Sequence, residues 1–221
     1  KAKVNLTFID AAKINKSNVK KNLSFADAVL VPGGFGERGI EGMIVACQFA
    51  RESNIPYFGI CLGMQIAVIE FARNILGFKN ANSTEFNPKT KFPVIGLVTE
   101  WKDKSGNTEY RDDSSDLGGT MRLGGQTCIL KKSSLSHKLY KDNKIIERHR
   151  HRYEFNNDFV ENFKKSEMKF VGHNPKSGLI EILELKNHKW FIGVQFHPEY
   201  KSTVINPHPL FKSFIKSTLK K

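Results

Sequence analysis

Three short, well-separated runs carry residue types suited to acyl-transfer chemistry. In the first, Cys61 follows the apolar run 55–60 and has Gly59 and Gly63 on either side. A nucleophile on a strand-to-helix turn is held in a tight conformation that small neighbours permit, and the helix N-terminus after it lowers a thiol pKa. A thiolate here could attack a carbonyl carbon, although the run alone fits a buried structural cysteine equally well.

The second run, Phe196-His197-Pro198-Glu199, ends a strongly apolar segment. A histidine there could act as general base and acid toward a thiol. A carboxylate two residues later could orient the imidazole and stabilise the imidazolium. In isolation the run favours a capping or surface histidine before a turn; together with Cys61 it supports the hypothesis of a Cys-His-Glu triad.

The third run is Pro-Gly-Gly-Phe-Gly at 32–36, which also follows a buried apolar run. Successive glycines allow backbone N–H groups to converge on an anion. In acyl transfer this would be an oxyanion hole, with the N–H of Leu62 as its second donor. A phosphate-binding loop is a competing interpretation, although the run lacks both common phosphate-loop spacings. An ordinary tight turn is the third interpretation.

Alternating strands and helices must bring these runs together. We predict strands at 4–9, 28–31 and 55–60, and helices at about 40–52 and 62–75. Strands separated by helices of this length indicate βαβ units and a parallel sheet.

The second half of the chain is richer in strands. The clearest strands are predicted at 94–98, 127–130, 179–185 and 190–196, with a closing helix at about 210–219. Residues 186–189 are a plausible hairpin connection. Segment 102–126 is polar and rich in glycine, which predicts a long surface loop. We find no convincing linker and expect one domain over residues 1–221.

The composition indicates a soluble globular protein. The 221 residues are 39% hydrophobic and 26% charged, enough for a single domain with a sizeable core. No apolar run approaches the ~20 residues of a membrane span, and no signal peptide opens the chain. Three cysteines without short paired spacing favour a reducing, cytoplasmic setting and argue against a disulfide framework or a zinc site.

The net charge of +13 invites a nucleic-acid interpretation, but the lysines are scattered along the chain. No nucleic-acid-reading motif accompanies them. A compositional bias with solvated charges is the favoured explanation. Attraction of an anionic small molecule such as a nucleotide is the second explanation, and the charge alone does not separate the two.

Taken together, the three runs resemble the class I (triad) glutamine amidotransferase domain. The longer runs 82–86, 116–124 and 147–154 are similar to the glutaminase domain of CTP synthases in particular, and the resemblance extends from about Phe25 to Phe214. It implies a flavodoxin-like α/β fold with a mostly parallel central sheet, helices on both faces and an extra strand-rich portion. The implied reaction is hydrolysis of glutamine, whose ammonia serves ATP-dependent amination of UTP to CTP.

The resemblance also implies roles for single residues. Cys61 would form the γ-glutamyl thioester, His197 would shuttle the proton, and Glu199 would orient His197. Gly34 and Leu62 would donate the oxyanion-hole N–H groups.

Further matching positions would bind glutamine: Gly33, Phe35, Gln65, Glu85, Arg152 and Tyr153. Glu85 suits the α-ammonium, and the planar guanidinium of Arg152 suits the α-carboxylate. Taken singly, these two could equally be an ordinary surface ion pair.

Residues 117–124 are similar to a lid-like loop associated in this family with activation by GTP. The positions that could respond to GTP are Arg38, Gly119, Thr120, Met121 and Arg122. A glycine-rich turn is the alternative. The Arg-His cluster at 148–152 should be split between two faces by strand alternation, one face lining the site and one facing solvent.

In CTP synthases a synthetase domain binds ATP, Mg²⁺ and UTP, and these 221 residues contain no phosphate-binding loop that could replace it. The family domain also opens with a further strand, so we expect the chain to be incomplete at its N-terminus, as a fragment, a partial gene product or a remnant. The expected partners are L-glutamine and the synthetase domain, with a homotetramer only in the full-length enzyme. We expect no cofactor or metal in the chain itself, and no nucleic-acid or membrane partner.

Three alternative functions remain open at this point. One is another cysteine hydrolase on the same scaffold, such as a γ-glutamyl peptidase. Another is a non-catalytic remnant that contacts filaments or partners. A basic nucleic-acid binder is the most distant.

Overall fold

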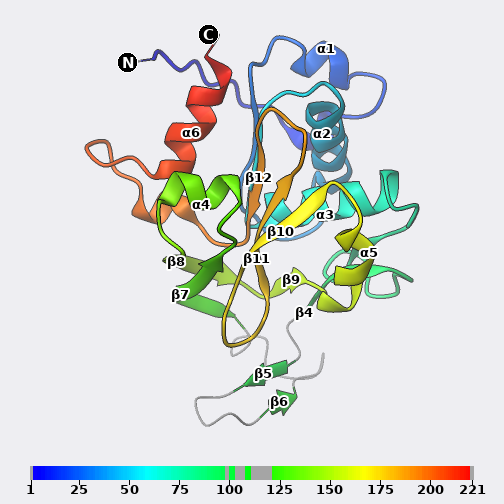
Figure 1. Cartoon of the computed structure of the whole chain (residues 1–221). Helices are drawn as coiled ribbons and strands as arrows, with labels where there is room; N and C mark the ends of the chain where they lie inside the picture. The colour runs from blue at the N-terminus through cyan, green and yellow to red at the C-terminus, as the bar shows by residue number, and fades with distance from the viewer. Residues whose placement is uncertain (1, 98–99, 103–107, 111–120, 220–221) are drawn as a thin grey trace.

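A seven-stranded mixed sheet forms the centre of the molecule (Figure 1). The structure is a computed structural model that describes residues 2–97, 100–102, 108–110 and 121–219. In spatial order the strands are β1 (Val29–Val31), β2 (Tyr57–Ile60), β12 (Phe191–Val194), β11 (Ile180–Leu185), β10 (Met168–His173), β7 (Arg122–Leu130) and β8 (Lys144–His151).

Only one side of this sheet is parallel. β1, β2 and β12 pair in parallel, whereas every pairing from β12 through β11, β10 and β7 to β8 is antiparallel. The α/β class expected from the sequence is confirmed, and the antiparallel half is the extra strand-rich portion. The hairpin expected between 179–185 and 190–196 is present as β11 and β12.

Helices cover both faces of the sheet. α2 (Ile40–Glu52) and α3 (Leu62–Asn74) pack against one face, and α4 (Leu135–Tyr140) and α6 (Pro209–Thr218) lie on the other (Figure 1). The shorter helices are α1 (Val19–Leu23), α5 (Val160–Lys164) and the 3₁₀ turns η1 (Ala11–Lys13), η3 (Asn157–Phe159) and η4 (Pro198–Lys201).

The side-chain alternation of the parallel strands divides the core in two. Tyr57 and Phe191 belong to the cluster that packs with α2 and α3, whereas Phe58 and Ile192 belong to the cluster that packs with α6. Successive residues of a strand point to opposite faces, so a strand covered on both sides must be apolar throughout. This explains why the run before Cys61 is continuously hydrophobic.

Two small sheets complete the described structure. β3 (Asn82–Ser83), β4 (Pro93–Leu97) and β9 (Tyr153–Phe155) form one, and β5 (Glu100–Lys102) pairs with β6 (Thr108–Tyr110) in the other. A single residue, Arg152, separates β8 in the large sheet from β9 in the small one. The chain therefore changes sheets at a residue predicted to bind substrate.

Two predictions of local structure are wrong. Residues 4–9 are not a strand: β1 is an edge strand that pairs only with β2 among the described strands, and Val4, Leu6 and Phe8 are 49%, 74% and 92% exposed. Their alternation therefore has no sheet to join. Residues 122–126 are not loop but the start of β7, because they pair along β8 from Arg122 opposite His151 onward.

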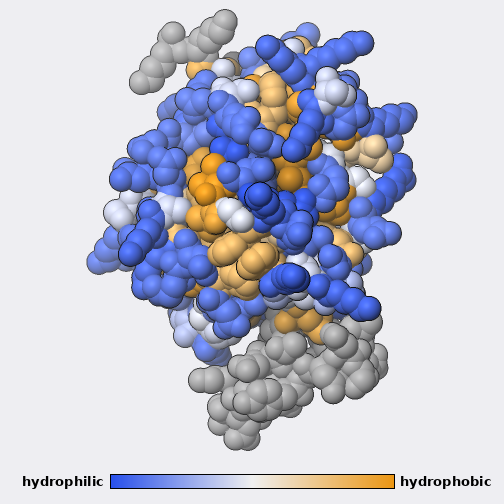
Figure 2. Space-filling view, turned by 90° about the vertical axis from the view of Figure 1, so that its right-hand side faces the viewer, coloured by the Kyte–Doolittle hydropathy of each residue, from blue (hydrophilic) through white to orange (hydrophobic). Residues whose placement is uncertain are grey.

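Hydrophilic side chains dominate the outer surface and surround separate apolar patches on the face shown in Figure 2. Most lysines in the described part of the chain are exposed, as the first of the two interpretations of the net charge requires. None of the helices in the described part of the chain is long and apolar enough to cross a membrane.

Candidate active site

Cys61 occupies a strained turn between β2 and α3. Its φ is 51° and its ψ is −103°, a region that residues other than glycine rarely adopt, and its N–H donates to Val194 O at 2.7 Å. A Cβ added at Gly63 would overlap the carbonyl oxygen of Val31, and one added at Gly59 would lie 2.5 Å from the Gly63 carbonyl. The predicted nucleophile turn is thus present, and close backbone approach explains both flanking glycines.

His197 and Glu199 form a close pair in the neighbourhood of Cys61. His197 Nδ1 lies 2.6 Å from Glu199 Oε1, which leaves Nε2 to act elsewhere. That Nε2 is buried and has no hydrogen-bond partner among the described residues. A Cβ added at Gly33 would lie 2.8 Å from His197 Cε1 and 3.4 Å from Cys61 Cβ, so both residues lie against this glycine.

The thiol of Cys61 is neutral in the free site. Burial raises its pKa to about 12; the N–H of Leu62 opposes this shift, and the charges of Glu199, Glu85 and Glu154 add to it. The pKa-lowering contact expected at the helix start therefore exists, but desolvation outweighs it. A neutral thiol needs a base that takes its proton as it attacks, and the free Nε2 of His197 suits that role.

The two residues predicted to donate the oxyanion-hole N–H groups belong to neighbouring segments. A Cβ added at Gly34 would lie 3.1 Å from Leu62 Cδ2, so the turn after β1 approaches the start of α3 next to Cys61. The phosphate-loop interpretation of residues 32–36 has no comparable support, because this turn faces a thiol and an imidazole.

A narrow pocket of about 10 Å³ opens beside Cys61. Its lining brings together five of the six residues predicted to bind glutamine, with the sixth, Gly33, next to them under His197. The lining residues are Gly34, Phe35, Cys61, Gln65, Glu85, His151, Arg152 and Tyr153.

Neighbouring residues already form hydrogen bonds and charge interactions with the polar residues of the pocket. Glu85 accepts the N–H of Gly36 at 2.8 Å. Burial raises the pKa of Glu85, while the Gly36 N–H and the charge of Arg152 lower it. Gln65 Nε2 donates to Tyr153 O at 2.8 Å, so the helix that carries the nucleophile also holds the backbone next to Arg152.

Two residues of the site were missed from the sequence. Gln195 is fully buried, and its Nε2 lies 3.7 Å from Cys61 Sγ, within the range of a hydrogen bond to sulfur. His151 lines the pocket. The sequence signal for Gln195 was a polar residue inside the apolar run predicted to be a strand. It lies two positions before His197, and alternate residues of a strand point to the same face. For His151 the predicted alternation was correct, and the histidines are the buried face while Arg148 and Arg150 are exposed.

Of the five residues predicted to respond to GTP, the structure describes Arg38, Met121 and Arg122. Arg38 is exposed and lies 3.5 Å from Asp10. Gly119 and Thr120 lie outside the described residues, and Met121 is partly buried. For Arg122 the prediction of a surface loop is wrong: it is 2% exposed and paired with two buried carboxylates, so its guanidinium does not face solvent.

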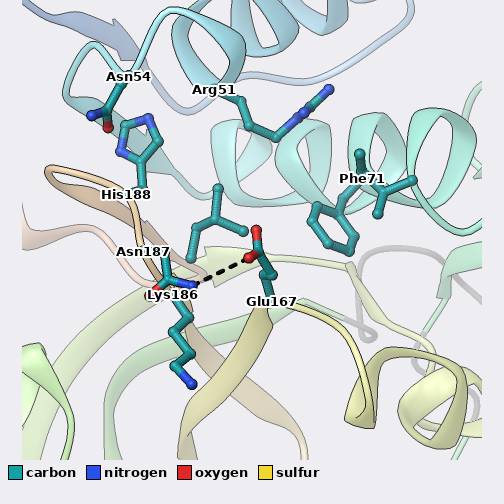
Figure 3. Close-up of a pocket in the computed structure, with 9 residues that line it drawn as sticks. Arg51, Asn54, Phe71, Glu167, Lys186, Asn187 and His188 are labelled. Atoms are coloured by element: carbon teal, nitrogen blue, oxygen red, sulfur yellow. Dashed lines mark hydrogen bonds between the residues drawn. The ribbon is translucent and has the colours of Figure 1, made fainter.

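A larger cavity of about 320 Å³ lies at the other end of α3 (Figure 3). Its lining includes Arg51, Phe71, Glu167, Lys186 and His188, and the dashed line in the figure joins Asn187 to Glu167 at 3.3 Å. A helix of 13 residues is ~20 Å long, so this cavity is remote from the thiol.

Comparisons with known proteins agree with this geometry. The family described as "Glutamine amidotransferase class-I" matches residues 1–217. Among solved structures, the chain is similar to a Trypanosoma brucei CTPS glutaminase domain with bound acivicin, at 35% identity and a TM-score of 0.86. That match covers 98% of this chain and 81% of the trypanosome chain.

A second solved structure shares the fold. It is described as a putative GMP synthase protein from Thermoplasma acidophilum, at 14% identity and a TM-score of 0.56. The match covers 90% of this chain and 76% of the other.

Proposed function

The chain belongs to the class-I glutamine amidotransferases, and we propose that it hydrolyses the side-chain amide of L-glutamine through a thioester on Cys61. The observation that carries the proposal is the arrangement of Cys61, His197 and Glu199 around Gly33. A strained thiol, an imidazole with a free buried nitrogen and a carboxylate behind it are the parts that acyl transfer by a cysteine requires.

In the first half-reaction the sulfur of Cys61 attacks the amide carbon while its proton passes to His197 Nε2. The carbonyl oxygen gains negative charge and accepts N–H bonds from Gly34 and Leu62. The imidazolium then gives its proton to the amide nitrogen, the carbon–nitrogen bond breaks, and ammonia leaves. Glu199, 2.6 Å from Nδ1, stabilises the imidazolium in between.

In the second half-reaction water replaces ammonia. His197 takes a proton from the water as its oxygen attacks the thioester carbon. Collapse of the tetrahedral intermediate returns the sulfur and its proton to Cys61 and releases glutamate. Because the pKa of Cys61 is raised to about 12, the sulfur is reprotonated at neutral pH before the next cycle.

The pocket walls account for recognition of a free amino acid. Glu85 pairs with the α-ammonium and Arg152 with the α-carboxylate, so a peptide-bound glutamine lacks one or both contacts. The charges of these two residues already interact in the free site. The free pocket is narrow, and Phe35 is the most exposed of its lining residues, at 53%. In this proposal Phe35 moves to admit glutamine.

We further propose that the ammonia serves the amination of UTP by a CTP synthase synthetase domain that binds ATP, Mg²⁺ and UTP, in a homotetrameric full-length enzyme. The support is the similarity to the trypanosome CTPS glutaminase domain. Activation by GTP through residues 117–124 remains part of this proposal, and Arg38, also predicted to respond, is exposed.

The first test is a glutaminase assay on the wild-type chain and two cysteine variants. Cys61→Ala should release no glutamate above background. Cys47→Ala is the matched control, because Cys47 is also fully buried but packs in the core cluster of α2. Undiminished hydrolysis by Cys61→Ala would refute the thioester.

The second test concerns the destination of ammonia. The chain is mixed with a separately produced CTP synthase synthetase domain, ATP, Mg²⁺ and UTP, and CTP is measured with glutamine or ammonium chloride as the nitrogen source. We expect glutamine-dependent CTP that Cys61→Ala abolishes while ammonia-dependent CTP persists. Glutaminase activity without any CTP from glutamine would contradict the CTP synthase assignment.

A further inference from the structure

Five buried side chains close a polar ring behind the candidate pocket. Arg122 Nη1 donates to both carboxylate oxygens of Glu154 at 2.7 Å, and Nη2 donates to Glu181 Oε1 at 2.8 Å. His149 Nδ1 lies 2.8 Å from His151 Nε2. Two longer contacts complete the circuit. His149 Nε2 is 3.5 Å from Glu181 Oε2, and His151 Nδ1 is 3.6 Å from Glu154 Oε1. We call these five side chains the buried ring.

The buried ring has an unbalanced charge when it holds no extra proton. None of its members is more than 2% exposed, so water screens none of its charges. One guanidinium faces two carboxylates, which leaves one uncompensated negative charge if both imidazoles are neutral. An uncompensated charge at such depth is strongly unfavourable, and proteins avoid it by binding or releasing a proton.

The hydrogen bonds of the buried ring also lack one proton. A neutral imidazole carries a single N–H, and the contact between His149 and His151 uses one of the two available. The other N–H can reach one carboxylate, and the remaining bare nitrogen then faces the other carboxylate lone pair to lone pair. Accordingly, His149 Nε2, His151 Nδ1 and Glu181 Oε2 have no hydrogen-bond partner among the described residues.

One proton repairs both deficits. Placed on the carboxylate that faces the bare nitrogen, it gives that nitrogen a donor and makes the whole ring neutral. Two arrangements meet these conditions. In one, Glu154 carries the proton and the two histidines adopt one pair of tautomers. In the other, Glu181 carries the proton and both histidines adopt the opposite tautomers.

We propose that the buried ring holds one shared proton at neutral pH, and that this proton keeps the charge behind Cys61 neutral and the pocket wall at His151 in place. The first half of the proposal concerns the folded chain alone. The second half rests on the proposed glutaminase function.

The protonation tendencies of the members agree with this assignment. Burial raises the pKa of Glu154 to about 8 against the opposing charge of Arg122, and burial likewise raises the pKa of Glu181. Burial and the nearby guanidinium lower the pKa of His149 to about 2, and burial also lowers that of His151. The proton therefore resides on the carboxyl pair rather than on an imidazole.

The buried ring touches the reaction site at two points. His151 is itself part of the pocket lining, and the charge of Glu154 is one of those that raise the pKa of Cys61. The charge of His197 acts on the pKa of both ring histidines, and the charges of Glu181 and Arg122 act on the pKa of Cys128 on β7. Within the described part of the chain no group of histidines, cysteines and carboxylates has the geometry of a metal site, and Arg122 already supplies the cation here.

The test uses amide variants that imitate a protonated carboxyl. In Glu154→Gln or Glu181→Gln the side-chain NH₂ can donate to the bare imidazole nitrogen without an extra proton. Glu147→Gln is the matched control: Glu147 is 1% exposed on the same strand β8, but it bonds Tyr140 and His208 instead of the ring.

The first readout is the unfolding free energy, from urea titrations between pH 5 and 9. A folded-state pKa raised from the usual 4.5 to about 8 means that the folded chain holds more protons than the unfolded chain between these values. The contribution of the ring proton to the unfolding free energy is therefore complete below about pH 4.5, and it is lost as pH rises through about 8. We expect this decline in wild type and Glu147→Gln, and a flatter profile in both ring variants.

The second readout is the pH profile of kcat/KM for glutamine hydrolysis. When wild type loses the ring proton, a negative charge appears near Cys61. The amide of Glu154→Gln has no such proton to lose, so this charge does not appear in the variant. The ratio of kcat/KM in Glu154→Gln to that in wild type should therefore rise about tenfold between pH 7 and 9. Glu147→Gln should keep a constant ratio to wild type.

The outcomes separate the two proposals. Equal decline of unfolding free energy with pH in wild type and both ring variants would overturn the shared proton, whatever the activity. A flattened decline with a pH-independent kcat/KM ratio would overturn its link to Cys61. A chain without glutaminase activity would count against the proposed function, while the unfolding data still decide on the ring. If neither ring variant folds, infrared spectra of wild type at pH 6 and 9 decide: a protonated-carboxyl band lost on raising pH supports the ring, and its absence at pH 6 overturns it.

Discussion

At Gly33 a missing side chain lets two reacting groups approach each other. The position of its absent Cβ lies 2.8 Å from His197 Cε1 and 3.4 Å from Cys61 Cβ. The first distance is shorter than real Cβ contacts, so even a methyl group must displace the imidazole. The turn at 32–36 therefore matters for the triad as well as for the proposed oxyanion hole.

We expect Gly33→Ala to lower kcat/KM for glutamine by about 100-fold, because small displacements of reacting groups are costly. Stability should change little, since the turn is at the edge of the core. The measurement is steady-state glutaminase kinetics with a thermal melt of the same preparations. Gly96→Ala is the control, because a Cβ there meets nothing within 4 Å. A kcat/KM within twofold of wild type for Gly33→Ala would contradict this account.

At the scale of elements, β8 and its neighbours place Arg152. Arg122 of β7 lies opposite His151 of β8, and Leu97 of β4 lies opposite Tyr153 of β9. The two neighbours of Arg152, His151 and Tyr153, are thus each paired in a different sheet. These pairings fix the path of the backbone between them. The buried ring lies behind this link and ties four strands together.

A polar contact between side chains joins strand β8 to the start of α6. His208 caps α6 by accepting the N–H of Leu210 at 3.3 Å, and its Nε2 lies 3.0 Å from Glu147 Oε1. Tyr140 of α4 donates to the same oxygen at 3.0 Å. One buried carboxylate on β8 therefore joins two helices to the sheet.

We expect His208→Ala to reduce the unfolding free energy by about 1–3 kcal/mol, because it removes a cap and leaves the carboxylate of Glu147 without one of its donors. Urea unfolding at pH 7 measures the loss. His137→Ala, a half-buried position on α4, should change it by less than about 0.5 kcal/mol. Equal losses in the two variants would argue against a special contribution of the cap.

How far the sequence predicts this molecule depends on the range of the interaction. The helix predicted at about 40–52 is α2, Ile40–Glu52, because helix signals are local in the sequence. The triad stays a prediction, which rests on the motifs, their order and the family resemblance. The strand expected at 4–9 failed because a strand needs a partner that alternation does not reveal. Arg122 was assigned to a loop because its two carboxylate partners lie 32 and 59 positions further along the chain.

At the scale of the whole molecule, one edge of the central sheet carries apolar side chains. Among the described strands β1 pairs only with β2, and Leu30 within it is 40% exposed. The segment before η1 adds Leu6 and Phe8, which are 74% and 92% exposed. An open strand edge next to exposed apolar side chains is a template for association between copies.

We expect the wild-type chain to self-associate as its concentration rises, despite its net charge of +13. The double variant Leu6→Ser with Phe8→Ser should shift this association to higher concentration, because it removes apolar surface without touching the core. Static light scattering over a concentration series measures the shift. Val204→Ser with Ile205→Ser is the control, since these residues are 100% and 97% exposed but lie after η4. An equal effect of both pairs would assign the association to general surface hydropathy.

The turn at Cys61 has a consequence for protein engineering. A backbone at φ 51° and ψ −103° is one that glycine tolerates far better than cysteine. We expect Cys61→Gly to be inactive yet to melt at a higher temperature than Cys61→Ala, with a gap of about 1–3 kcal/mol in unfolding free energy. A library selected for heat resistance alone would therefore be enriched in inactive sequences at this position, so any such campaign needs an activity screen at every round.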